Sequence, residues 1–172
     1  MEKSSLDDSP QFRYTGDEVK EPYHYKMCGL DDIYLVSGYK FEDTAYGRGV
    51  VIQNMKGLHC AIGKFIVKCK KTLNAKEVRY LRHEMDLTQA ELGDLLRVTD
   101  QTVARWEKGE TSIPGPADLL LRNFYLTHID MDFDLRELVK ELREQDAPTR
   151  ERLLFSPTAK GWKSETTCAY AY

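Results

Sequence analysis

The sequence of 172 residues contains no long hydrophobic run, and this excludes a helical membrane span. A transmembrane helix needs about 20 consecutive apolar residues, and every apolar stretch of the chain is far shorter. The N-terminus is acidic and polar, unlike the apolar core of a secretory signal peptide. We therefore expect a cytoplasmic protein without a membrane partner.

Cysteine is also scarce, and the four that occur do not form the dense framework of a disulfide-rich secreted domain. A zinc ribbon needs a pair of cysteines at each of two places. Here Cys28-Gly29-Leu30-Asp31 and Cys60-Ala61-Ile62-Gly63 each keep one cysteine of such a pair. His59 and Asp31 are possible replacements, but neighbours on a strand point in opposite directions, which separates His59 from Cys60. We expect no metal, no cofactor and inert cysteines.

Motifs of common enzyme classes are missing as well. The sequence has no glycine-rich phosphate loop, no paired zinc histidines on a helix and no nucleophile elbow. Cys60 follows His59 directly, but sequence neighbours rarely form a working nucleophile and base. We therefore expect a protein that is not an enzyme.

The charge of the chain is unevenly distributed, although its net value is only −3. Residues 64–83 hold seven Lys or Arg against one acid, whereas residues 1–24 and 127–155 are each net −3. A local basic patch of this kind suits a polyanion such as nucleic acid.

The most informative stretch runs from Thr88 to Gly109 and predicts two short helices joined by a turn. Thr88 and Thr99 are each placed to cap a helix start. Gly93 lies inside the first helix, where it costs about 1 kcal/mol relative to Ala, so we expect another helix to cross closely at that point. This pattern predicts a helix-turn-helix.

The second helix of this stretch is the expected DNA-reading element, because Val103 and Trp106 face inward and leave polar residues outside. Gln pairs well with adenine and Arg with guanine in the major groove of double-stranded DNA. The alternative is a plain helical bundle whose polar residues are only solvated. We predict DNA contacts from Gln89, Thr99, Asp100, Gln101, Thr102, Arg105 and Lys108, with Lys70 and Lys71 at phosphates.

The remaining chain predicts an α+β protein, with a small β-rich ribbon-like domain before an all-α bundle. Ile33–Val36 and Val50–Ile52 are strand-like, and Asn54–Gly57 is typical of a hairpin turn leading into Leu58–Cys60. Helical spacing follows from Ile62 to Leu73, and again over 75–86, 117–126 and 135–142. We expect four regions: a flexible arm (1–22), the β-rich domain ending in a basic helix (23–72), the helix-turn-helix domain (73–146) and a tail without an assigned element (147–172).

The stretch around Thr88–Gly109 resembles the helix-turn-helix of the Cro and lambda-repressor type, the XRE family. The matching positions include Gln89, Leu92, Gly93, Val98, Thr99, Val103, Arg105, Trp106, Glu107 and Gly109. Arg97 stands where that family usually has a turn glycine, so we expect a positive φ at this arginine.

The order of parts over residues 23–126 also resembles the MqsA-type antitoxins, which join a zinc ribbon to a Cro-like domain. The likeness rests on Gly57-Leu58-His59-Cys60 and on the helix-turn-helix. By position, the family's outward Asn and Arg correspond to Gln101 and Arg105. The missing cysteines imply a degenerate ribbon without metal.

These observations favour a dimeric, sequence-specific transcriptional repressor. One alternative is an antitoxin that masks a toxin through residues 23–72 and regulates its own operon. Another is a sensor in which Tyr34, Tyr39, Phe41 and Tyr46 line a ligand site in the β unit.

Overall fold

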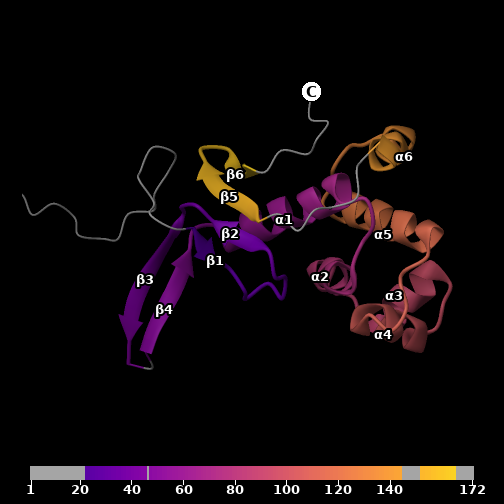
Figure 1. Cartoon of the computed structure of the whole chain (residues 1–172), viewed down its shortest axis with the longest axis horizontal. Helices are drawn as coiled ribbons and strands as arrows, with labels where there is room; N and C mark the ends of the chain where they lie inside the picture. Colours follow the sequence, from indigo (N-terminus) through magenta and orange to yellow (C-terminus); the bar gives the residue numbers. More distant parts are fainter. Residues whose placement is uncertain (1–21, 46, 145–151, 166–172) are drawn as a thin grey trace, which may run out of the picture.

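The computed structural model describes residues 22–45, 47–144 and 152–165, and its architecture is α+β as the sequence predicts. The strands gather at one end of the molecule and the helices at the other (Figure 1). The arm expected at 1–22 lies outside the described residues, except for Pro22. No helix of the described part is long and apolar enough to cross a membrane.

Six helices follow the first four strands. Their bounds are Met55–Cys69 (α1), Ala75–Glu84 (α2), Gln89–Leu96 (α3), Asp100–Lys108 (α4), Gly115–His128 (α5) and Leu135–Glu144 (α6). Asn74 caps α2 in a capping box with Glu77. Pro116 lies in the first turn of α5, where its missing N–H costs nothing.

The strands form two sheets. A four-stranded sheet has the order β1-β2-β5-β6, from Tyr23–His24 (β1), Ile33–Leu35 (β2), Leu153–Thr158 (β5) and Gly161–Ser164 (β6). A separate hairpin pairs Tyr39–Thr44 (β3) with Gly47–Ile52 (β4). The sequence predicted no element in the C-terminal tail, yet β5 lies parallel to β2 and completes the N-terminal sheet.

The expected hairpin turn at Asn54–Gly57 and strand at Leu58–Cys60 are wrong, because α1 begins at Met55. The side chain of Asn54 accepts a hydrogen bond from the Gly57 backbone N–H at 3.0 Å and caps the helix. Leu58 then continues the buried stripe of Ile62 and Ile66 at helical spacing. A residue type shared by turns and helix caps misled the sequence interpretation.

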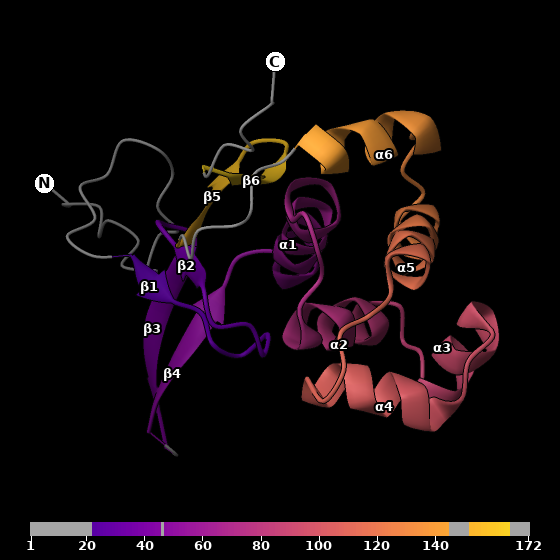
Figure 2. The ribbon, with the colours of Figure 1, turned by 45° about the vertical axis from the view of Figure 1, so that its right-hand side comes forward.

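Helix α1 joins the two halves of the fold. It contacts α2, α5 and α6 on one side and β6 on the other (Figure 2). Gly63 leaves room for the Tyr125 phenol of α5, since a Cβ at this position would overlap with that ring. The buried Arg122 side chain of α5 donates to the Ile66 and Val67 carbonyl oxygens of α1, and pairs with Asp118. The helix-turn-helix therefore rests on a scaffold tied to the sheet.

Candidate nucleic-acid interface

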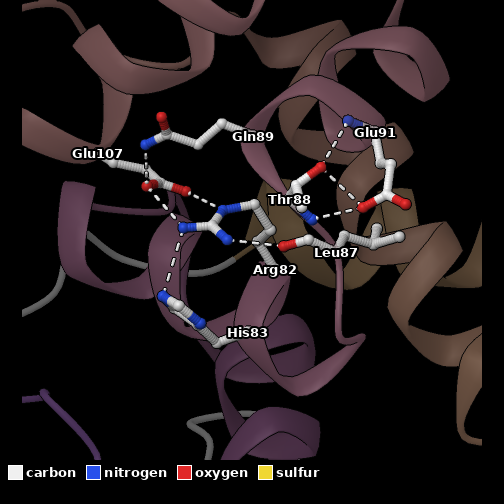
Figure 3. Close-up of polar contacts among 7 residues, drawn as sticks. All are labelled: Arg82, His83, Leu87, Thr88, Gln89, Glu91 and Glu107. Atoms are coloured by element: carbon white, nitrogen blue, oxygen red, sulfur yellow. Dashed lines mark hydrogen bonds and ion pairs between the residues drawn. The ribbon is translucent and has the colours of Figure 1, made fainter.

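Helices α3 and α4 both begin at the threonine caps that the sequence predicts. The Thr88 hydroxyl accepts from the Glu91 N–H at 3.2 Å, and the Glu91 carboxylate accepts from the Thr88 N–H at 2.7 Å (Figure 3). The Thr99 hydroxyl accepts from the Thr102 N–H at 3.2 Å. These caps satisfy backbone donors that a helix start leaves free, and they hold the start of each helix in place.

The turn between the two helices is tight. Arg97 adopts φ 59° and ψ 40°, which confirms the positive φ expected at this non-glycine residue. A Cβ on Gly93 would lie 2.8 Å from the Val98 carbonyl oxygen, so glycine allows the turn to pack directly on α3. The close approach at Gly93 is therefore made by the turn and the first residue of α4, and not by a helix that crosses over it as we expected.

Helix α4 has an apolar face and a polar face. Val103 is fully buried and Trp106 is 4 % exposed, so both anchor the helix in the core. Asp100, Gln101 and Arg105 lie at the surface. Thr102 is half-buried, and its hydroxyl lies 2.9 Å from that of Thr99.

The start of α3 is tied to α4 by a polar network that the sequence did not reveal. The Gln89 amide nitrogen donates to Glu107 Oε2 at 2.8 Å, and Glu107 also accepts from Arg82 of α2 (Figure 3). Arg82 additionally donates to the Leu87 carbonyl oxygen at 2.6 Å and contacts His83. The sequence did contain a signal for this network. Arg82 lies four residues after the inward-facing Val78, so a charged side chain falls on the buried face of α2.

The electrostatics of this network favour an ionised Glu107. Burial by itself raises the pKa of this carboxyl group, but hydrogen bonds from Arg82 and Gln89 outweigh it. The charges of Arg82 and Arg79 add to the effect, so the pKa of Glu107 lies below its usual range. The carboxylate therefore remains a charged acceptor that holds three helices together.

The three lysines of the predicted site lie in different surroundings. Lys108 is on the last turn of α4, with a side chain 69 % exposed. Lys71 is exposed in the α1–α2 connection, which is tied to α5 by a 2.9 Å hydrogen bond from the Leu73 N–H to Asp118. Lys70 is only 15 % exposed, and its ammonium lies 3.6 Å from Glu77.

The polar side chains of the N-terminal half are also engaged within the fold. His59 contacts Tyr25 and Glu84 through its two ring nitrogens, each at 2.8 Å. Cys28 and Cys60 carry free thiols, and burial raises the pKa of Cys28. Within 22–45, 47–144 and 152–165, no three His, Cys, Asp or Glu side chains are grouped to hold a metal ion.

Comparison with known proteins identifies the segment that contains α3 and α4. Residues 78–121 match the family model described as helix-turn-helix, and they cover most of α2, all of α3 and α4, and the first half of α5. No curated protein and no solved structure matches the chain. The family match does not reach residues 23–72, so their likeness to the MqsA-type ribbon stays a prediction.

Proposed function

We propose that this chain is a DNA-binding transcription regulator that represses transcription from a specific operator, as a dimer. The match of residues 78–121 to the helix-turn-helix family model supports this proposal. A single recognition helix covers only a few base pairs, and two-fold dimers on inverted half-sites are the usual solution for this motif. Such a regulator acts in the cytoplasm, where the DNA is.

The exposed face of α4 supports a base-reading role. Gln101 and Arg105 are one turn apart, so they lie on the same side of the helix. The guanidinium fork of Arg105 matches the O6 and N7 acceptors of guanine, and the Gln101 amide matches adenine. Trp106 fixes the rotation of α4 about its axis, because its indole is buried beside the exposed Arg105.

The phosphates on either side of the groove need donors that carry no sequence preference. The Gln89 amide nitrogen is already bound to Glu107, and the capping box uses the Thr88 and Glu91 N–H groups. We therefore assign the phosphate contact at α3 to the backbone N–H of Gln89. Thr99 and Asp100 lie at the corresponding start of α4. Lys108, on the last turn of α4, and Lys71, in the α1–α2 connection, supply positive charge for further phosphate contacts.

The experiment is a binding-site selection from random duplexes with the full chain, followed by titrations of the selected and a scrambled duplex. Arg105→Ala should weaken binding to the selected duplex by about 1–3 kcal/mol and change scrambled binding little. Arg136→Ala, at an exposed position of α6, is the matched control and should leave both affinities unchanged.

Equal losses on selected and scrambled duplexes would show that Arg105 contacts the backbone instead of a base. Trp106→Ala separates reading from folding, since loss of a buried indole should cost about 3–5 kcal/mol of unfolding free energy. Arg105→Ala should leave that free energy nearly unchanged, because its side chain is exposed.

A second function, that of an antitoxin, is supported by the β3–β4 hairpin. This hairpin forms a two-stranded sheet of its own and carries Phe41, which is 43 % exposed, with the Arg48 guanidinium 4.3 Å from the ring centre. Tyr23 of β1 packs against Tyr39 and Phe41, and the exposed part of the Phe41 ring is apolar surface that a protein partner would cover. If a neighbouring reading frame encodes a protein that is lethal alone, co-expression with the full chain should restore growth. Replacing Phe41 with Ser should abolish that rescue.

A further inference from the structure

A cavity of about 530 Å³ lies where the β1–β2 loop meets α1 and α2, and it also reaches Glu107 of α4. Figure 2 shows the β1–β2 loop extending from the strands toward α2 and the C-terminal end of α4. The volume lies within the range of small-molecule sites, which is about 300–1,000 Å³. The DNA-reading face described above uses none of its other lining residues.

One wall of the cavity is held by hydrogen bonds within the protein. His59 contacts Glu84 through Nδ1 and the Tyr25 hydroxyl through Nε2, each at 2.8 Å. The Tyr80 hydroxyl donates to the His59 carbonyl oxygen at 2.9 Å. Burial raises the pKa of Tyr25 to about 12 and that of Tyr80 further, so both phenols stay neutral. A wall fixed in advance loses little conformational entropy when a ligand binds.

The free polar groups of the cavity are donors. Its two glutamates are occupied, Glu84 by His59 and Glu107 by Arg82 and Gln89. Lys76 pairs with Asp31 at 2.5 Å. Arg79 forms no hydrogen bond or ion pair with any residue that the structure describes, and its guanidinium fork suits a planar oxyanion. Arg79 is therefore the cation that the cavity offers to a ligand.

The cavity also offers apolar surface. Met27 is 70 % exposed at the loop, although a methionine in open solvent contributes nothing to folding. Methionine and tyrosine side chains both pack favourably against aromatic rings. A planar apolar body against the exposed Met27, with an anionic group at Arg79, would engage both side chains together.

We propose that this cavity binds a small aromatic anion, and that its occupancy changes DNA binding through Glu107. Glu107 lines the cavity and accepts the hydrogen bond from Gln89 at the start of α3. An anion held at Arg79 places negative charge beside Glu107, and the bonds of Glu107 to Arg82 and Gln89 set the start of α3 against α4. This second half rests on the proposed function, whereas ligand binding itself does not.

The test uses anilinonaphthalene sulfonate, a fluorescent aromatic anion, and its uncharged parent phenylnaphthylamine, with the full chain and no DNA. Saturable binding of one anion per chain is expected, and Arg79→Gln should weaken it about tenfold or more. The uncharged dye should bind both proteins alike. Arg136→Gln on α6 is the matched control, and Met27→Gln should weaken both dyes. Anion binding that Arg79→Gln leaves unchanged would overturn the site.

The second arm measures affinity for the selected duplex with and without saturating sulfonate dye. A change of about fivefold or more in the wild type, absent in Arg79→Gln, is expected for coupled sites. An unchanged affinity in the presence of bound dye would overturn the coupling. If Arg79→Gln instead weakens all duplexes alike, with a shallower salt dependence and normal dye binding, Arg79 contacts DNA phosphate and the ligand proposal is wrong.

Discussion

Arg82 of α2 and Glu107 of α4 meet at two points inside the helix-turn-helix domain. Arg82 Nε lies 2.6 Å from Glu107 Oε1, and Arg82 Nη2 lies 3.0 Å from Oε2 (Figure 3). Their side chains are only 8 % and 4 % exposed. The pair therefore ties the recognition helix to its supporting helix in a place that water hardly reaches.

Loss of Glu107 should be costly. Glu107→Ala leaves the Arg82 charge buried without a counterion, so we expect the free energy of unfolding to fall by about 3–5 kcal/mol. Urea unfolding of the full chain measures it. Glu110→Ala, one residue beyond the C-cap of α4 and exposed, is the matched control and should change stability little. A Glu107 effect as small as that of Glu110 would contradict the structural role.

The same pair predicts an acid-sensitive fold. The pKa of Glu107 is lower in the folded protein than in the unfolded chain, where it is about 4.3. The contribution of Glu107 to stability is therefore fully present above the unfolded pKa and is lost as the pH falls through the folded pKa. Glu77 changes stability with pH in the opposite direction, since burial raises the pKa of its carboxyl group. Unfolding measured from neutral pH into acid should therefore show a smaller decline for Glu107→Gln than for the wild type. Parallel profiles would contradict this prediction.

The close approach of α1 and α5 depends on Gly63. Gly63→Ala places a methyl group against the Tyr125 phenol, so we expect a loss of about 1–3 kcal/mol from overpacking. Gly115→Ala is the control, because a Cβ there meets open space. Adding Tyr125→Phe to Gly63→Ala should recover part of the loss. The measurement is the thermal unfolding midpoint of the wild type, the two alanine variants and the double variant. Equal midpoints for Gly63→Ala and Gly115→Ala would refute the packing argument.

The two neighbouring lysines should separate into different roles. Lys71→Ala should weaken all duplexes alike and reduce the slope of log affinity against log salt by about 1, as for one lost phosphate contact. Lys70→Ala should instead lower stability, because it removes the partner of the buried Glu77. Lys140→Ala on α6 serves as the control for both measurements. An unchanged salt slope in Lys71→Ala would show that this lysine faces away from DNA.

Metal should not hold the N-terminal half together. Zinc binds thiolates, yet burial raises the pKa of Cys28, and both His59 ring nitrogens already have partners. We expect elemental analysis of the purified chain to find no stoichiometric zinc, and a chelator to leave the unfolding curve unchanged. One zinc per chain that resists dialysis would refute this prediction.

The sequence alone determined the local features of the helix-turn-helix. Helix caps, the apolar stripe of α4 and the positive φ of Arg97 depend on residues at most a few positions apart, so spacing was sufficient to predict them. The exposed positions of Gln101 and Arg105 followed from the inward turn of Val103 and Trp106. The roles of these exposed residues at DNA remain predictions.

Tertiary structure decided what depends on distant parts of the chain. The parallel pairing of β5 with β2 joins Leu153 to Ile33, and no local pattern encodes a partner so far away. Asn54 is a common residue in turns and in caps, and only the burial of Leu58 and Ile62 selects the helix. The Arg82–Glu107–Gln89 network likewise arises because three helices cross at one point, where burial makes each hydrogen bond necessary.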